Sequence, residues 1–335
     1  MCSGYFILKE DEPMGFIFFL KSVVYVIKSR GGNNLITSLK EIIGQANNQK
    51  KCIAVASAED KDVLISLSEA ERHGMATFLL FGDAVKIKET LENNNLIFSH
   101  AEIIDAKSGE EASYQAAKAV SEGRADIIMK GLVDTKVLLK AVLSKDLDLR
   151  KNELLSHVMV YELKSYHKLI LLTDGGMVMK PSLKEKENII RNVKVLAKIF
   201  GLSPMKVAAL SAVEKVNPNL ESSVDAQSLQ EIFRDDKEVV VEGPLSFDIA
   251  ISHESAKHKG VKGEVPGEAD VLLVPSLEAG NFLGKSFTYM AGADSAGVIL
   301  GAKCPVILTS RSDSSEVKLN SIALAVMMSI SKEEN

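Results

Sequence analysis

The stretch CPVILTSRSDSSEVKLNSIALA, Cys304–Ala325, joins a short apolar segment to an amphipathic one through a polar loop. Val306–Thr309 is apolar and β-branched, which predicts a buried strand, and apolar residues recur at helical spacing from Val317 onward. A helix is therefore expected to begin near Ser314 or Ser315. A polar loop between a strand and a helix N-terminus is suited to binding an anion, because free backbone N–H groups and the helix dipole favour negative charge there.

The same loop contains the side chains that an anion site needs. Arg311 can bind an anion through two N–H donors, and Ser310 adds a hydroxyl group. Asp313 and Glu316 add carboxylates, which can act as a base. The alternative interpretation is a helix capped by Ser314 beside a solvated arginine, and this stretch alone does not decide between the two.

Length and composition limit the class of protein. A chain of 335 residues is long for one hydrophobic core, so two domains or one large α/β domain are expected. An apolar content of 46% and a charged content of 25% are typical of a globular protein. The net charge of −5 argues against a general nucleic-acid binder. Three cysteines and six histidines show no metal-ligand spacing, so we expect a cytoplasmic protein without a bound metal.

The N-terminal segment differs from the rest of the chain. Met14–Ile27 is strongly apolar, but Lys21 interrupts it and it is shorter than the ~20 apolar residues that span a bilayer. A signal peptide is a poor match, because acidic residues precede the apolar run and no small-residue cleavage site follows it. We therefore expect residues 1–33 to be an extension outside the fold, and we expect no membrane association.

Further along, short apolar segments alternate with amphipathic ones. The predicted strands include KCIAVA (51–56), TFLLF (77–81), DIIM (126–129), KLILLT (168–173) and ADVLLV (269–274). This alternation indicates a parallel-rich sheet with helices on both faces, in which ligands bind beyond the carboxyl ends of strands. Ala291–Gly297 consists of small residues and is expected to form a tightly packed helix.

Several loops after predicted strands contain candidate ligand donors. Glycine lets a ligand approach the backbone closely, and lysine supplies a positive charge. The candidate substrate-binding residues in these loops are Lys130, Gly131, Asp174, Gly175, Gly176, Lys215, Gly280, Asn281 and Lys285. The alternative for the glycines is a tight turn, and the alternative for the lysines is a solvated charge.

Five separated segments resemble one enzyme family. They are MKGLVDT (Met129–Thr135), LLTDGGMVMKPSLKEK (Leu171–Lys186), EGPLSFDIA (Glu242–Ala250), VPSLEAGNFLGK (Val274–Lys285) and ILTSRSDSSE (Ile307–Glu316). In this order they resemble the phosphate acetyl/butyryl transferases, with the closest likeness to the butyryltransferase members. The resemblance extends from about residue 36 to the C-terminus. No G-x-G-x-x-G or G-x-x-x-x-G-K-[ST] motif is present in the sequence.

The resemblance implies both a fold and an activity. It implies two three-layer α/β domains with an interdomain cleft, as in isopropylmalate-dehydrogenase-like folds. Residues 34–150 and 305–335 would form domain I, and residues 151–304 would form domain II. It also implies transfer of a butyryl or branched short-chain acyl group between coenzyme A and inorganic phosphate. No cofactor is required, because coenzyme A and phosphate are substrates, and a homo-oligomer is expected.

Site residues follow from the resemblance position by position. Ser310 and Arg311 match a Ser-Arg pair of the related acetyltransferases. The acidic residue that follows that pair falls near Glu316 or Val317, and Asp313 is also close, so the general base stays open between Glu316 and Asp313. Other arginines that hold phosphate in the acetyltransferases have no clear counterpart. Their candidate replacements are Lys130, Lys215 and Lys285, and the candidates for an acyl pocket or for the core are Met177, Met179, Phe282 and Leu283.

The sequence leaves three alternative functions open. Phosphate acetyltransferase is the first, because the sequence does not fix the length of the acyl chain. A metal- and NAD-dependent decarboxylating dehydrogenase of the same fold would need a cluster of aspartates, which the isolated Asp174, Asp248 and Asp294 do not convincingly form. A non-catalytic acyl-CoA-binding module would need the cleft but no base.

Overall fold

The computed structural model describes residues 35–310 and 312–333, so the predicted extension of residues 1–33 lies outside the described part. In chain order the described helices and strands are α2 (Leu39–Ala46), β1 (Lys51–Ala56), α3 (Lys61–Arg72), β2 (Ala76–Gly82), α4 (Ala84–Asn93), β3 (Ala101–Asp105), α5 (Gly109–Ser121), β4 (Ile127–Lys130), α6 (Thr135–Val142), β5 (Ser156–Glu162), β6 (Ile170–Thr173), α7 (Leu183–Phe200), β7 (Met205–Leu210), α8 (Glu221–Ile232), β8 (Val239–Leu245), α9 (Phe247–Ile251), α10 (His253–His258), β9 (Val271–Leu273), α11 (Leu277–Tyr289), β10 (Asp294–Leu300), β11 (Val306–Ile307) and α12 (Ser315–Glu333).

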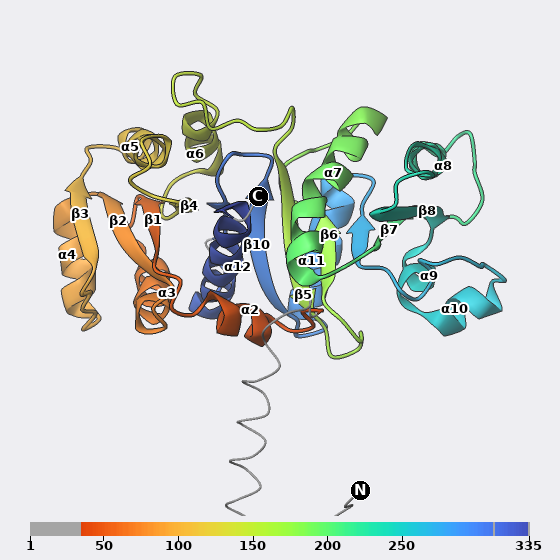
Figure 1. The fold of residues 1–335 in the computed structure, drawn as a ribbon, viewed down its shortest axis with the longest axis horizontal. Helices are drawn as coiled ribbons and strands as arrows, with labels where there is room; N and C mark the ends of the chain where they lie inside the picture. The colour runs from red at the N-terminus through yellow and green to blue at the C-terminus, as the bar shows by residue number, and fades with distance from the viewer. Residues whose placement is uncertain (1–34, 311, 334–335) are drawn as a thin grey trace, which may run out of the picture. The chain divides into compact units, whose positions relative to one another are not determined.

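The described strands form one sheet of 11 strands in the order β3-β2-β1-β4-β11-β10-β5-β6-β9-β7-β8. β10 is antiparallel to β11 and to β5, and β5 is antiparallel to β6, whereas the other neighbouring pairs are parallel. Figure 1 shows β3 and β8 at the two ends of this arrangement. The predicted α/β class with a parallel-rich sheet is confirmed. The division into residues 34–150 plus 305–335 and 151–304 stays a prediction.

Local sequence signals determine where several helices begin and end. Ser314 Oγ accepts a hydrogen bond from Val317 N at 3.3 Å, so α12 is capped where the sequence predicts. Ser182 and Glu185 form a capping box at the start of α7, and this helix ends at Gly201 with φ of 72°. These contacts satisfy backbone groups that a helix end would otherwise leave unpaired.

The prediction for Ala291–Gly297 is wrong, because β10 begins at Asp294 and forms a central strand. Small residues pack closely in a helix or in a strand, so composition alone did not separate the two possibilities. The pairing of β10 with both β5 and β11 decides the outcome. Ser295 of this strand lines the central cavity described below.

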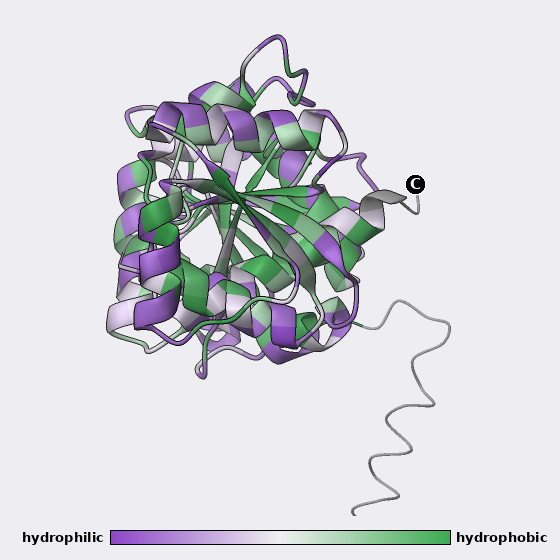
Figure 2. Ribbon diagram, turned by 90° about the vertical axis from the view of Figure 1, so that its left-hand side faces the viewer, coloured by the Kyte–Doolittle hydropathy of each residue, from purple (hydrophilic) through white to green (hydrophobic). Residues whose placement is uncertain are grey.

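Apolar side chains cover the two faces of the sheet differently. One face carries a continuous hydrophobic core with α2, α3, α7, α8 and α12. The other face has two separate clusters, one with α5 and α6 and one with α9, α10 and α11. Figure 2 shows the apolar strands enclosed between helices whose outward sides are more hydrophilic. Between the two separate clusters, the middle of the sheet is open to a cavity.

Candidate active site

A cavity of about 540 Å³, called the central cavity below, lies over the middle strands of the sheet. Its floor comes from β5, β6 and β10, and its walls come from α11, from the start of α6 and from residues 308–310 and 312–314. The predicted site residues that line the central cavity are Lys130, Gly175, Gly176, Gly280, Asn281, Lys285, Ser310 and Asp313. Segments from both halves of the chain therefore meet at one site.

The remaining predicted residues lie elsewhere. Arg311 is outside the described residues, although Ser310 and Ser312 on either side of it both line the central cavity. Lys215 is exposed in the loop after β7, and Glu316 is exposed in the first turn of α12, so neither lines the cavity. The spacing of residues in the sequence does not separate Lys215 and Glu316 from the predicted residues that line the cavity.

The loop before α12 is closed by its own polar contacts. Asp313 Oδ2 accepts a hydrogen bond from Ser310 N at 2.7 Å, and Asp313 N donates to Ser310 O at 3.1 Å. The hydroxyl groups of Ser310 and Ser312 are 3.0 Å apart. The buried Lys318 donates to the carbonyl of Asp313. The loop thus presents a hydroxyl group and a carboxylate to the cavity beside the N-terminus of α12.

Lys130 and Gly131 have different roles although they are adjacent. The Lys130 side chain is buried, and its Nζ donates to the carbonyl oxygens of Gly131 and Val133 at 3.2 Å each. A Cβ added at Gly131 would lie 2.0 Å from Ser57 O, in the backbone at the end of β1. The close packing against β1 accounts for this glycine, whereas Lys130 places a positive charge at the cavity wall.

Asp174 binds the backbone of the loop that contains Gly175 and Gly176. It is 1% exposed, and its Oδ1 accepts hydrogen bonds from Gly176 N and Met177 N at 2.8 Å each. Its Oδ2 accepts a hydrogen bond from His157 N at 2.9 Å. Gly175 packs against the backbone of Gly280 in α11, where an added Cβ would lie 2.7 Å from Gly280 C. These contacts make Asp174 a structural residue of the loop that borders the cavity.

Comparisons with known proteins identify the family of the chain. A family model described as "Phosphate acetyl/butaryl transferase" matches residues 37–113 and 106–326. The chain belongs to this family. A probable phosphate butyryltransferase of Bacillus subtilis (strain 168) is 45% identical over 294 residues, which is 87% of this chain and 98% of that protein.

Two further relatives extend the likeness. A phosphate butyryltransferase of Clostridium beijerinckii is 41% identical over 302 residues, which is 90% of this chain and 98% of that protein. The crystal structure of a branched-chain phosphotransacylase from Enterococcus faecalis V583 superposes with a TM-score of 0.76 at 35% identity. That match covers 83% of this chain and 99% of the other. The family resemblance inferred from five short segments therefore holds over most of the chain.

Three cavity residues of this family member were not predicted from sequence. His157, Met159 and Tyr161 all line the central cavity from β5. Alternate residues of a strand point to the same face, so the alternation in HVMVYE was the available signal. The intervening Val158 and Val160 belong to the core on the opposite face.

His157 and Tyr161 are both affected by burial and by the cavity carboxylate. Burial lowers the pKa of the His157 imidazole, while the charges of Asp174 and Asp313 act in the opposite direction. Among the described residues, His157 Nδ1 has no hydrogen-bond partner. Burial raises the pKa of Tyr161 to about 12, and the charge of Asp313 adds to this effect. Asp313 is therefore close enough to act electrostatically on the cavity floor.

The apolar residues predicted for an acyl pocket lie outside the central cavity. Met179 is 78% exposed and Phe282 is 69% exposed. Met177 packs against the cluster with α5 and α6, and Leu283 packs against the cluster with α9, α10 and α11. The apolar part of the cavity comes from other residues.

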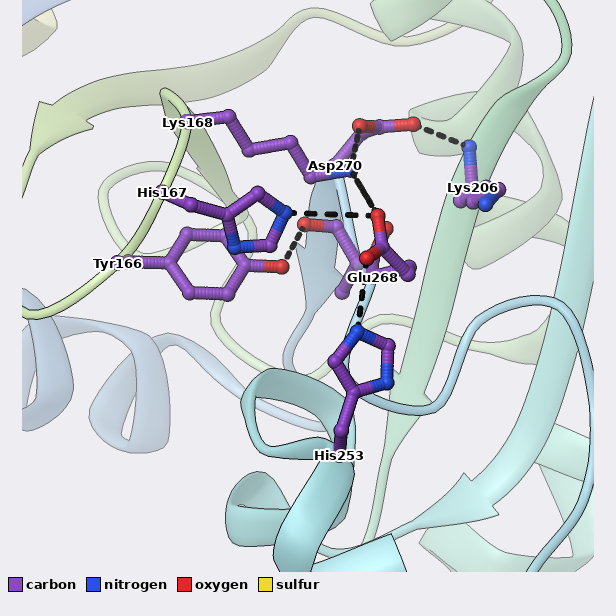
Figure 3. Close-up of polar contacts among 8 residues, drawn as sticks. Tyr166, His167, Lys168, Lys206, His253, Glu268 and Asp270 are labelled. Carbon is purple, nitrogen blue, oxygen red and sulfur yellow. Dashed lines mark hydrogen bonds and ion pairs between the residues drawn. The ribbon is translucent and has the colours of Figure 1, made fainter.

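A second polar cluster lies at the amino ends of β6, β9 and β7 (Figure 3). Lys168 Nζ is 2.7 Å from Asp270 Oδ1, and His253 Nε2 is 2.8 Å from Glu268 Oε1. Burial opposes ionisation of Glu268, but the hydrogen bond with His253 and the charges of Lys168 and His167 outweigh it and lower its pKa to about 2. The cluster stabilises the start of these strands and does not line the central cavity.

The described part of the chain shows neither a metal-ion site nor a helix that could span a membrane. No group of three or more His, Cys, Asp or Glu side chains there is placed to hold a metal ion. Within the same residues, no helix combines the length and apolar character needed to cross a membrane.

Proposed function

We propose that this protein transfers a short-chain acyl group between coenzyme A and inorganic phosphate, with butyryl or a branched chain as the acyl group. The observation that carries the proposal is one cavity that joins the Ser310–Asp313 loop and Lys130 to an apolar floor. Sequence identities of 45% and 41% to proteins named probable phosphate butyryltransferase and phosphate butyryltransferase, over most of the chain, support it. Phosphate acetyltransferase is the alternative within the same chemistry.

In the direction of acyl phosphate synthesis, a phosphate oxygen attacks the thioester carbonyl carbon. A tetrahedral oxyanion forms, the carbon–sulfur bond breaks, and coenzyme A leaves as a thiolate that takes up a proton. Ser310, Arg311 and the N-terminus of α12 would stabilise the oxyanion and the phosphate, and Lys130 would add positive charge at the cavity wall. In an acidic protein, such local donors are needed to attract two anionic substrates.

In the reverse direction, the thiol of coenzyme A must lose a proton, since the thiolate is the nucleophile. Asp313 is our choice for the base. It lines the cavity and influences Tyr161 and His157, whereas Glu316 is exposed and lies away from the cavity. The hydrogen bond from Ser310 N orients the Asp313 carboxylate toward this role.

Coenzyme A would extend along α11. Asn281 and Lys285 are exposed on this helix and line the cavity, and they offer an amide and an ammonium group. Gly280 lies next to Asn281 in this helix, Gly175 packs against it, and together with Gly176 these glycines line the cavity and let a ligand approach the backbone. Domains of residues 34–150 plus 305–335 and 151–304 would then form the two sides of a cleft. A cytoplasmic homo-oligomer is part of the proposal, on family resemblance.

The test is to mix the purified protein with butyryl-CoA and phosphate and to measure free thiol. Thiol release that requires phosphate is expected, together with thioester formation from butyryl phosphate and coenzyme A. Tight acyl-CoA binding without phosphate-dependent turnover would contradict the proposal and favour a binding module. Arg311→Ala should lower the rate in both directions while the far-ultraviolet circular dichroism spectrum stays unchanged.

A further inference from the structure

The floor of the central cavity lies at the edge of the hydrophobic cluster with α9, α10 and α11, where side chains of β5 and β6 line both the cluster and the cavity. Met159 and Tyr161 project from β5 to this side of the sheet, because Val158 and Val160 point to the continuous core on the other side. Leu172 joins them from the neighbouring β6. These three side chains give the cavity an apolar surface.

Small residues of β10 leave room for the side chains of this surface. Gly297 pairs with Met159 in the register of the two strands, and Ser295 pairs with Tyr161. A Cβ added at Gly297 would lie 2.5 Å from Met159 Sδ. The methionine side chain therefore occupies space that any larger residue on β10 would fill.

α11 approaches the same floor through a glycine. A Cβ added at Gly284 would lie 2.5 Å from Tyr161 Oη and 3.3 Å from Leu172 Cδ2. The glycine brings α11 close to the floor without filling the cavity with a side chain. The apolar floor is thus bounded by strand residues below and by helix backbone at the side.

Ser310 and Asp313 form a polar rim of the central cavity. Ser310 and Asp313 line the same cavity as Met159 and Leu172. A thioester whose carbonyl reacts at the rim would carry its hydrocarbon chain into the nearest apolar surface, because burying each methylene there is favourable.

We propose that Met159, Tyr161 and Leu172, called the β5 floor, bind the hydrocarbon chain of the acyl group and set its preferred length, and that Gly297 gives the Met159 side chain the room to lie beside the cavity. This inference rests on the proposed acyl transfer and adds the residues that choose the substrate. Apolar residues of the neighbouring loops play no part in it, since Met179 and Phe282 are exposed and do not line the cavity.

Two substitutions from different strands test the β5 floor. Met159→Phe and Gly297→Ala both reduce the space over the floor. Each is expected to lower the ratio of kcat/KM for butyryl-CoA to kcat/KM for acetyl-CoA, by about tenfold for Met159→Phe. Met159→Ala enlarges the space and should raise the ratio of hexanoyl-CoA to butyryl-CoA. Met179→Phe makes the same exchange of residue type outside the cavity and should leave both ratios unchanged.

The outcomes separate this inference from the proposed function. An active wild-type protein whose Met159→Phe and Gly297→Ala variants melt at the wild-type temperature and keep the wild-type ratio would overturn the β5 floor alone. A wild-type protein that is inactive with acetyl-, butyryl- and hexanoyl-CoA would overturn the acyl transfer and the floor together. If Met159→Phe melts early, the ratio measured on Gly297→Ala decides the question.

Discussion

Replacing Asp174 distinguishes a structural role from a substrate-binding role for a residue that sequence motifs place in the site. Its buried carboxylate accepts hydrogen bonds from the backbone N–H groups of Gly176, Met177 and His157. Asp174→Ala leaves these three donors without their acceptor. A buried donor without a partner costs about 1–3 kcal/mol, so the loss of unfolding free energy is expected to reach about 5 kcal/mol.

Asp174→Asn provides a graded comparison. The amide keeps one oxygen, which can still accept from Gly176 N and Met177 N, but its NH₂ group then faces the donating His157 N–H. The expected loss is about 2 kcal/mol, from one hydrogen bond and its unsatisfied donor. Asp235→Ala, at an exposed aspartate, is the matched control and should change stability by less than about 0.5 kcal/mol.

Urea-induced unfolding followed by far-ultraviolet circular dichroism measures these differences, since the chain contains no tryptophan for fluorescence. The expected order of midpoints is wild type and Asp235→Ala highest, then Asp174→Asn, then Asp174→Ala. If Asp174→Ala unfolds at the same urea concentration as Asp235→Ala and only KM for acyl-CoA rises, the structural assignment is refuted and Asp174 is a ligand residue.

Three other predictions follow from the described contacts. Asp313→Asn should lower kcat for thioester formation by about 10²-fold or more, whereas Glu316→Gln should change it by less than about twofold; equal losses would contradict the choice of base. Gly131→Ala should lower the melting temperature strongly because its Cβ would lie 2.0 Å from a backbone oxygen, while Gly44→Ala, with nothing within 4 Å, should not. The pKa of Glu268 is lowered from its ordinary value of 4.5 to about 2 in the folded protein, so its stabilising contribution is expected to be present above pH 4.5 and to be lost as the pH falls toward 2. Glu268→Gln should flatten this part of the unfolding free energy profile, and an unchanged profile would contradict the assignment.

Sequence reasoning predicted the fold class because each local pattern agreed with the next. Buried apolar runs became β1, β2, β4, β6 and β9, and a hydroxyl residue caps α12 at Ser314. The order of strands in the sheet could not be predicted in this way. β11 lies between β4 and β10, and β10 lies between β11 and β5, although these strands are far apart along the chain. Such pairings depend on tertiary packing, which local periodicity does not encode.

Several loop residues that line the central cavity were among the predicted site residues, whereas the lining residues from the strands were not. Lys130, Gly280 and Ser310 stand out in sequence because polar residues and glycines interrupt apolar runs. Met159 and Tyr161 do not stand out, because apolar residues in a central strand normally belong to the core. Both side chains touch the hydrophobic cluster with α9, α10 and α11 and also line the cavity, which only the tertiary packing reveals.

A structural boundary supports our choice of Asp313 as the base, where sequence spacing leaves two carboxylates open. Asp313 and Glu316 are three positions apart, and both follow the Ser-Arg pair closely. The cap at Ser314 divides them, so that Asp313 belongs to the loop and Glu316 belongs to the first turn of α12. The loop folds back through the hydrogen bond from Ser310 N to Asp313 and borders the cavity, whereas the Glu316 side chain is exposed. A base must reach the thiol, and of these two carboxylates only that of Asp313 lies at the cavity where the thiol would react.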